Sequence, residues 1–182
     1  MFELIAVILI ENLPAMKTII IYMSTHGCTE RVVHELAEEL SGKVTLKNLR
    51  EDKRPCFHDY DRIIIGGSIR AGQIQRKIRE FCETNIDQLG DKELGLFICC
   101  MSEGEEAFQQ LNKAFPERLH QYARSEAVLG GEFNIEKMSF LEKIILKKIS
   151  KIEETVCNID HEAIQHFAQK MDKTFSPFLL LV

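Results

Sequence analysis

Residues 18–30 read TIIIYMSTHGCTE and join an apolar, β-branched run to a short turn of small hydroxylated residues. The run predicts a buried strand, because strands covered by helices on both faces are apolar almost throughout. After the turn, apolar residues recur at helical spacing from Cys28 to Leu40, opposite charged residues, which predicts an amphipathic helix. A strand that passes into a helix through such a turn is typical of an α/β fold with a parallel sheet.

The same alternation continues along the chain and predicts repeated βα units. The five predicted strands are Thr18–Met23, Val44–Leu49, Arg62–Gly66, Leu94–Cys100 and Ala127–Gly131. The predicted helices are Cys28–Leu40, Ile74–Ile86, Glu105–Tyr122, Ser139–Ile152 and Asp160–Met171. Pro116 is expected to kink or split the third helix, and Asp160 to cap the last. The first, third and fourth strands are the most apolar, so we place them at the centre of the sheet.

Composition limits the class of protein before any motif is considered. The chain has 182 residues, 45% hydrophobic and 28% charged, as expected of a globular protein with a sizeable core. A net charge of -5 excludes general nucleic-acid binding, which needs a basic surface. The six cysteines contain no CxxC pair and no zinc-ligand spacing, so we expect reduced thiols, a cytoplasmic protein and no metal site.

The two ends of the chain differ from the middle. Residues 1–15 hold an apolar run that is too short to span a membrane and lacks the basic region of a secretory signal. We interpret them as an N-terminal extension, with an added edge strand or a subunit contact as the alternative. Residues 174–182 form an apolar tail that we expect to pack on something. The domain itself is expected to cover residues 16–173, and a homodimer is one way to cover the apolar ends.

The turn Ser24–Thr29 has the chemistry of a phosphate site. It lies at the carboxyl end of the first strand and at the start of a helix, where backbone N–H groups and the helix dipole favour an anion. Gly27 allows close approach, and the hydroxyls of Ser24, Thr25 and Thr29 can donate hydrogen bonds. The Walker and GxGxxG motifs are absent from the sequence. The alternative interpretation is that the turn only caps the helix.

Three stretches resemble known flavoproteins. STHGCTE resembles the flavodoxin phosphate loop, commonly T/S-x-T-G-N-T. The matching positions are Ser24, Thr25, Gly27 and Thr29, and the departures are His26 and Cys28. Residues 66–72, GGSIRAG, resemble the G-A-S-I-R-x-G loop of the menaquinone-dependent protoporphyrinogen IX dehydrogenase family. Residues 127–131 and 139–149 are similar to the final strand and the basic helix of that family.

The resemblance covers residues 16–172 and implies a flavodoxin-like, doubly wound, five-stranded parallel sheet of order 2-1-3-4-5. It also implies FMN at the carboxyl ends of the strands, with residues 24–29 on the phosphate and residues 68–72 and 101–106 on either side of the ring. The cofactor-binding residues that follow are Ser24, Thr25, His26, Gly27, Cys28, Thr29, Gly67, Ser68, Ile69, Arg70, Ala71, Gly72, Met101, Ser102, Glu103 and Gly104.

Arg70 is the expected catalytic residue. Its guanidinium could stack on the flavin, stabilise the reduced anion or bind substrate carboxylates; the alternative is a solvated loop arginine. Flavodoxins usually sandwich the ring between aromatics, whereas this chain has no Trp and carries Ile69, Arg70 and Ala71 there. An uncovered ring favours an enzyme that admits a substrate.

Two features of the segment after the fourth strand qualify the resemblance. The family's longer, basic insertion is nearly absent there. Residues 102–106 also fit a helix start, with Ser102 as cap and Glu105 completing a capping box.

Cys28 lies at the start of the first predicted helix. We expect the helix N-terminus to lower the pKa of its thiol, without giving it a catalytic role.

The segment Ser139–Ile152 is basic and amphipathic. Such a helix could contact an anionic membrane near a quinone pool, or pack on the sheet as an ordinary crossover helix. The expected function is an FMN-dependent oxidoreductase that passes electrons from an organic reductant to a quinone-like acceptor. The alternatives are an electron carrier that serves redox partner proteins and a flavin-free binding module.

Overall fold

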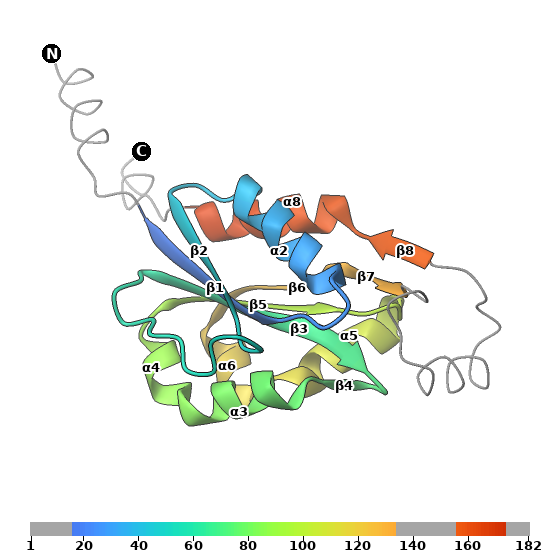
Figure 1. Cartoon of the computed structure of the whole chain (residues 1–182), viewed down its shortest axis with the longest axis horizontal. Helices are drawn as coiled ribbons and strands as arrows, with labels where there is room; N and C mark the ends of the chain where they lie inside the picture. Colours follow the sequence, from blue (N-terminus) through green and yellow to red (C-terminus); the bar gives the residue numbers. More distant parts are fainter. Residues whose placement is uncertain (1–15, 134–155, 174–182) are drawn as a thin grey trace, which may run out of the picture.

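The computed structural model describes residues 16–133 and 156–173. Both terminal segments and the expected helix 139–152 lie outside the described residues. Within them, five strands form a parallel sheet in the order β2-β1-β3-β5-β6 (Figure 1). These strands are β1 Lys17–Met23, β2 Lys43–Asn48, β3 Arg62–Arg70, β5 Glu93–Cys99 and β6 Ala123–Val128. Numbered as successive parallel strands, this is the predicted order 2-1-3-4-5, which is confirmed.

Helices cover both faces of the sheet (Figure 1). One layer consists of α2 Cys28–Glu39 and α8 His161–Asp172. The opposite layer consists of α3 Arg76–Thr84, α4 Ile86–Gly90, α5 Gly104–Ala114 and α6 Glu117–Tyr122. Both layers bury apolar side chains against the sheet, so the described residues form a three-layer α/β fold.

The apolar run of β1 supplies both halves of the core. Ile19 and Ile21 pack toward the layer of α3 to α6, whereas Ile20 packs toward α2 and α8. Alternate side chains of a strand point to opposite faces, so a strand buried on both sides must be apolar at every position. On β5, Gly95 makes room for α8, since a Cβ there would lie 2.8 Å from the Phe167 ring.

The fifth strand was predicted in the wrong place. We expected Ala127–Gly131, but β6 starts at Ala123, and Gly130 belongs to a separate strand. That strand, β7 Gly130–Phe133, pairs antiparallel with β8 Val156–Ile159. Gly130 has a φ of 69°, and a Cβ there would lie 1.9 Å from the Asn158 carbonyl oxygen, so the chain turns away from the sheet at a residue without a side chain. The polar residues Arg124, Ser125 and Glu126 hid β6 from a pattern based on apolar runs.

The second helix also begins later than predicted. Ile74 was expected to start it, but β3 continues to Arg70 and folds back as the short strand β4 Gln73–Ile74. Ile74 is buried in the same core as Ile78 of α3. The four-residue spacing of Ile74 and Ile78 suggested one helix, but the two residues pack in the same core from different elements.

Two signals from single residues, Pro116 and Asp160, are confirmed. Pro116 separates α5 from α6, as expected of a residue that lacks the N–H of a helix interior. Asp160 caps α8, because its carboxylate accepts a hydrogen bond of 2.9 Å from the Ala163 N–H. No helix among the described residues is long and apolar enough to cross a membrane.

Candidate functional site: the carboxyl edge of the sheet

The predicted phosphate loop joins β1 directly to α2. Gly27 is the N-cap of α2 and has a φ of 94°, a left-handed conformation that glycine adopts without strain. Its N–H donates to the Ser24 hydroxyl at 3.2 Å, which closes the turn. Within the described chain no side chain caps α2, so the N–H groups of its first turn have no side-chain acceptor. The loop therefore presents uncapped donors at the positive end of a helix dipole, the donor set that an anion such as a phosphate requires.

The side chains of this loop divide into two groups. Thr25 is exposed and His26 is half-buried, so both are accessible to a ligand. Cys28 and Thr29 are buried, with exposed fractions of 9% and 2%. Of the three hydroxyls predicted to donate to a phosphate, those of Ser24 and Thr29 belong to buried side chains, whereas that of Thr25 is accessible.

The segment after the third strand is a hairpin and not the loop that the sequence suggested. Ser68, Ile69 and Arg70 continue β3, and Ala71 and Gly72 form the two-residue turn to β4. Both turn residues have positive φ, 47° and 75°, as in the type I′ turns that connect tight hairpins. Because β3 pairs with β1 only up to Gly67 and with β5 only up to Ser68, the hairpin tip extends beyond the paired ends of both neighbouring strands.

Arg70 contacts the phosphate loop. Its Nη2 lies 2.9 Å from Nδ1 of His26. A guanidinium can only donate, so Nδ1 accepts and the neutral ring carries its proton on Nε2. The contact joins two of the three segments that the resemblance assigns to the cofactor, and it places the expected catalytic residue beside the phosphate loop.

The third segment, Met101 to Gly104, leads from β5 into α5. Ser102 does not cap this helix, contrary to the predicted capping box: the N-cap is Glu103, without a side-chain cap bond, and α5 begins at Gly104. The Ser102 hydroxyl instead accepts a hydrogen bond of 3.0 Å from the side chain of Gln110, which lies within α5. Glu103 accepts one of 3.2 Å from Asn158 of β8. The segment is short, and its polar groups are held by neighbouring elements.

These three segments lie at one edge of the sheet. They follow β1, β3 and β5, which are adjacent and parallel, with Met23 paired to Gly67 and Ser68 paired to Cys99. Carboxyl ends of parallel strands share an edge, and ligands of such sheets bind there, where the connections diverge to opposite faces. The structure thus brings the sequence-predicted segments to one edge, and the contact of Arg70 with His26 joins the first two directly.

Sequence reasoning missed Gln75, the residue before α3. Its Nε2 donates to the Met23 carbonyl at 3.1 Å and to the Ser68 hydroxyl at 2.6 Å. The side chain therefore ties the end of β1 to the end of β3 beneath the predicted cofactor segments. No pattern in the sequence marks this role, because it depends on a hairpin that folds Gln75 back onto β3.

A pair of thiols lies under the phosphate loop. The pKa of Cys28 is lowered, chiefly because the Cys99 thiol donates a hydrogen bond to it, while burial acts in the opposite direction. The pKa of Cys99 is raised for the complementary reasons, its hydrogen bond to Cys28 and its burial. The sequence predicted the direction of the Cys28 shift but attributed it to the helix N-terminus and missed Cys99.

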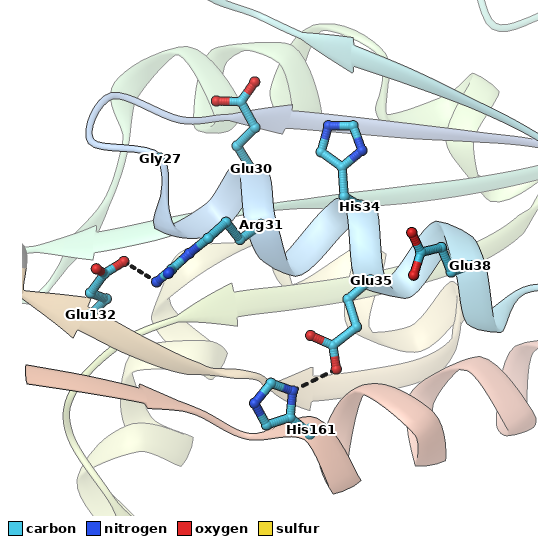
Figure 2. A pocket seen from close by; sticks show the side chains of 8 residues that line it. All are labelled: Gly27, Glu30, Arg31, His34, Glu35, Glu38, Glu132 and His161. Atoms are coloured by element: carbon cyan, nitrogen blue, oxygen red, sulfur yellow. Dashed lines mark hydrogen bonds and ion pairs between the residues drawn. The ribbon is translucent and has the colours of Figure 1, made fainter.

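A hollow of about 720 Å³ lies elsewhere, on the outer face of α2. Figure 2 shows side chains of α2 around it together with Glu132 of β7 and His161 of α8. Arg31 forms an ion pair with Glu132, and His161 lies within hydrogen-bond distance of Glu35, at 2.7 Å, so these contacts attach α2 to its neighbours. The hollow touches the phosphate loop at Gly27 but is lined by no residue of the hairpin. It therefore borders the candidate site at Gly27 without including the hairpin.

Comparison with known proteins gives matches of three kinds. Among curated relatives, the protoporphyrinogen IX dehydrogenase (quinone) of Escherichia coli K12 is 31% identical over 77 residues, 41% of this chain and 42% of that protein. The chain thus matches about two fifths of the length of that relative. Among solved structures, Flavodoxin 1 from Bacillus cereus is 20% identical with a TM-score of 0.53, covering 88% of this chain and 99% of that one.

A flavodoxin mutant from Fusobacterium nucleatum bound to flavin mononucleotide is 10% identical with a TM-score of 0.50, covering 88% of this chain and 97% of that one. At such identities the structural likeness establishes the fold. The match that carries further is to the family described as the flavodoxin domain, which extends over residues 19–158, more than half of the chain. Together with the sheet order, it shows that this chain belongs to the flavodoxin domain family.

Proposed function

We propose that this protein binds FMN at the carboxyl edge of the sheet and works as an oxidoreductase, passing electrons from an organic reductant to a quinone-like acceptor. The observation that carries the proposal is the uncapped start of α2, which offers N–H donors and a positive dipole end without a protein acceptor among the described residues. Membership of the flavodoxin domain family supports a flavin as the ligand. The related flavodoxin mutant bound to flavin mononucleotide supports FMN in particular.

The residues of the chain would divide the work of binding. The first-turn amides of α2 and the exposed Thr25 would hold the phosphate, and the hairpin from Ser68 to Gly72 would lie against the ring. FMN, when bound, supplies the capacity to accept and return electrons singly or in pairs. Arg70 would provide a fixed positive charge beside the site, where it stabilises negative charge on a reduced ring or on a substrate carboxylate.

Two observations support an enzyme with its own substrate. The hairpin tip carries Ile69, Arg70 and Ala71, so no aromatic residue at the tip would cover the ring. The E. coli relative is named a protoporphyrinogen IX dehydrogenase that uses a quinone, which supports a quinone-like acceptor here. Contact of residues 139–152 with an anionic membrane near such an acceptor, a cytoplasmic location and a homodimer stay predictions.

A flavodoxin-type electron carrier is the second candidate. It is favoured by the short connection between β5 and α5, which leaves little chain to enclose a substrate, and by a net charge of -5, which suits docking to basic redox proteins. A carrier exchanges electrons with proteins and turns over no small molecule of its own.

The first experiment is FMN addition to the purified protein, followed by desalting, an absorbance spectrum and an anaerobic reductive titration. The enzyme is supported by two results together. The retained FMN is reduced in one two-electron step, and the protein catalyses oxidation of protoporphyrinogen with menadione as the acceptor. Reduction in two resolved one-electron steps without such turnover supports the carrier. Absence of retained FMN at micromolar protein contradicts both, with riboflavin as the control for recognition of the phosphate.

A further inference from the structure

Gln75 joins two of the predicted cofactor segments from below. It is the residue before α3, and its side chain reaches back to the sheet instead of toward solvent. One hydrogen bond of Nε2, at 3.1 Å, goes to the carbonyl of Met23, which immediately precedes the phosphate loop. The other, at 2.6 Å, goes to the hydroxyl of Ser68 on β3. The carboxamide therefore fixes the distance between the phosphate loop and the hairpin.

The bond to Ser68 also orients its hydroxyl. A serine hydroxyl has two acceptor sites and one proton to donate, and an amide N–H occupies one of the acceptor sites here. The Ser68 proton must then be directed away from Gln75. Ser68 is half-exposed, and no described side chain or carbonyl takes that proton. The proton is left for a ligand at the carboxyl edge of the sheet.

Stability alone does not account for this arrangement. Oε1 of Gln75 is buried without a hydrogen-bond partner among residues 16–133 and 156–173, which costs free energy in the folded state. The same atom lies 2.3 Å from the position that a Cβ of Gly67 would occupy, so Gly67 must lack a side chain for the carboxamide to fit. A buried amide kept at such a cost points to a role in the site.

We propose that Gln75 is a positioning residue for the flavin ring: it holds the ends of β1 and β3 together and directs the Ser68 hydroxyl proton to the bound ring. This inference rests on the proposed binding of FMN. Ser68 makes the contact with the ring, and Gln75 acts through Ser68. Neither hydrogen bond of Gln75 involves the phosphate-binding amides of α2.

The test compares Gln75→Met, which keeps the side-chain length and removes both donors, with the wild type. Flavin fluorescence quenching should show FMN binding weakened about tenfold, as for loss of a hydrogen bond to a buried site. Riboflavin should be weakened by the same factor, because the change affects the ring and not the phosphate. The matched control is Gln73→Met, two residues earlier, at the exposed position of β4, which should leave both affinities within about twofold.

Ser68→Ala and the double variant separate positioning from mere support. If Gln75 acts through Ser68, the double variant binds FMN no more weakly than Ser68→Ala alone, within about twofold, whereas independent effects would multiply. Gln75→Glu, which replaces the donor with an acceptor in the same shape, repeats the comparison if Gln75→Met does not fold. Multiplying effects, or FMN binding by folded Gln75 variants within about twofold of wild type, overturns this proposal alone. Wild-type protein that binds no FMN overturns the proposed function and this inference with it.

Discussion

Ala71 carries the backbone strain of the hairpin. Its φ of 47° is the only positive value at a non-glycine position among the described residues. The left-handed conformation brings a Cβ close to the following carbonyl oxygen, at a cost of about 1–2 kcal/mol. Strain of this kind persists where the surrounding structure imposes it, and here it lies at the tip that presents Arg70.

Ala71→Gly should therefore raise the free energy of unfolding by about 1 kcal/mol, because relief of strain exceeds the added entropy of the unfolded chain. Urea unfolding followed by circular dichroism measures the change. Ala37→Gly, within the regular helix α2, is the control with the opposite sign and should cost about 1 kcal/mol. A destabilised Ala71→Gly variant would show that the turn is not strained.

The thiol pair gives a prediction with a definite pH direction. The pKa of Cys28 is lowered chiefly by its hydrogen bond from Cys99, so removal of that donor must raise it. In Cys99→Ala, the pH at which Cys28 reaches half its maximal alkylation rate should move upward, since less thiolate exists at any given pH. Peptide mass spectrometry after iodoacetamide pulses resolves Cys28 from the exposed Cys56 and Cys157.

Cys100→Ala is the matched control, because Cys100 is the next residue but packs on the opposite face of the sheet. Its removal should leave the pH profile of Cys28 in place. An unchanged profile in Cys99→Ala would mean that the helix N-terminus, as the sequence suggested, determines the Cys28 pKa.

At the scale of the elements, Arg62 attaches α8 to the amino edge of the sheet. It is 2% exposed, and its guanidinium donates at 2.6 Å to both the Asp172 carboxylate and the Met171 carbonyl. Glu93 of β5 lies 3.4 Å from Nε and also pairs with Arg124 of β6. The positive charge sits at the carboxyl end of α8, where the helix dipole favours it.

Arg62→Ala should lower the free energy of unfolding by about 3–5 kcal/mol, since it removes a buried guanidinium from the partly buried carboxylates of Asp172 and Glu93, of which Glu93 keeps its pair with Arg124. Chemical denaturation measures the loss. Arg76→Ala removes an exposed ion pair with Glu80 within α3 and should cost less than about 0.5 kcal/mol. Because Arg62 lies at the edge opposite the candidate site, FMN affinity of the folded variant should stay within about twofold. Equal losses in the two variants would contradict a stabilising network.

At the scale of the whole molecule, the stabilising ion pairs of Arg62 and the candidate site lie at opposite edges of the sheet. The ion pairs of Arg62 lie at the amino ends of the strands, whereas the phosphate loop, the hairpin and the segment after β5 lie at the carboxyl ends. Ligand binding at the carboxyl edge adds to the stability of the folded state without changing the core. The size of that addition depends on ligand concentration.

FMN at 100 times its dissociation constant should stabilise the protein by about 2.7 kcal/mol. For a chain of this length, that corresponds to a rise in melting temperature of roughly 5–10 °C. Because the chain has no Trp, the shift is measured by differential scanning fluorimetry with an added dye, or by calorimetry. Adenosine monophosphate, which offers a phosphate without the ring, should give little shift, and an equal rise with both compounds would indicate a phosphate site alone.

Much of the architecture could be predicted because local patterns and burial agree. The apolar strands β1, β3 and β5, the helix after the phosphate loop, the split at Pro116 and the cap at Asp160 all follow from periodicity or from single-residue chemistry. Prediction failed at β6, a polar strand at the edge of the sheet. It also failed at Ile74 and Ile78, which pack in one core at helical spacing but belong to different elements. In both cases the deciding contacts come from another part of the chain.

The sequence by itself determined the central strands of the sheet, the turn that joins β1 to α2 and the residues that follow these strands at the carboxyl edge, because these depend on apolar runs, turn chemistry and chain order. The complete strand order came from the resemblance to a known family. Only the tertiary structure decided how those residues act on one another. Arg70 contacts His26, Cys99 donates to Cys28, and Gln75 joins Met23 to Ser68. All but the contact of Gln75 with Ser68 join elements far apart in sequence, and each depends on packing that no local pattern encodes.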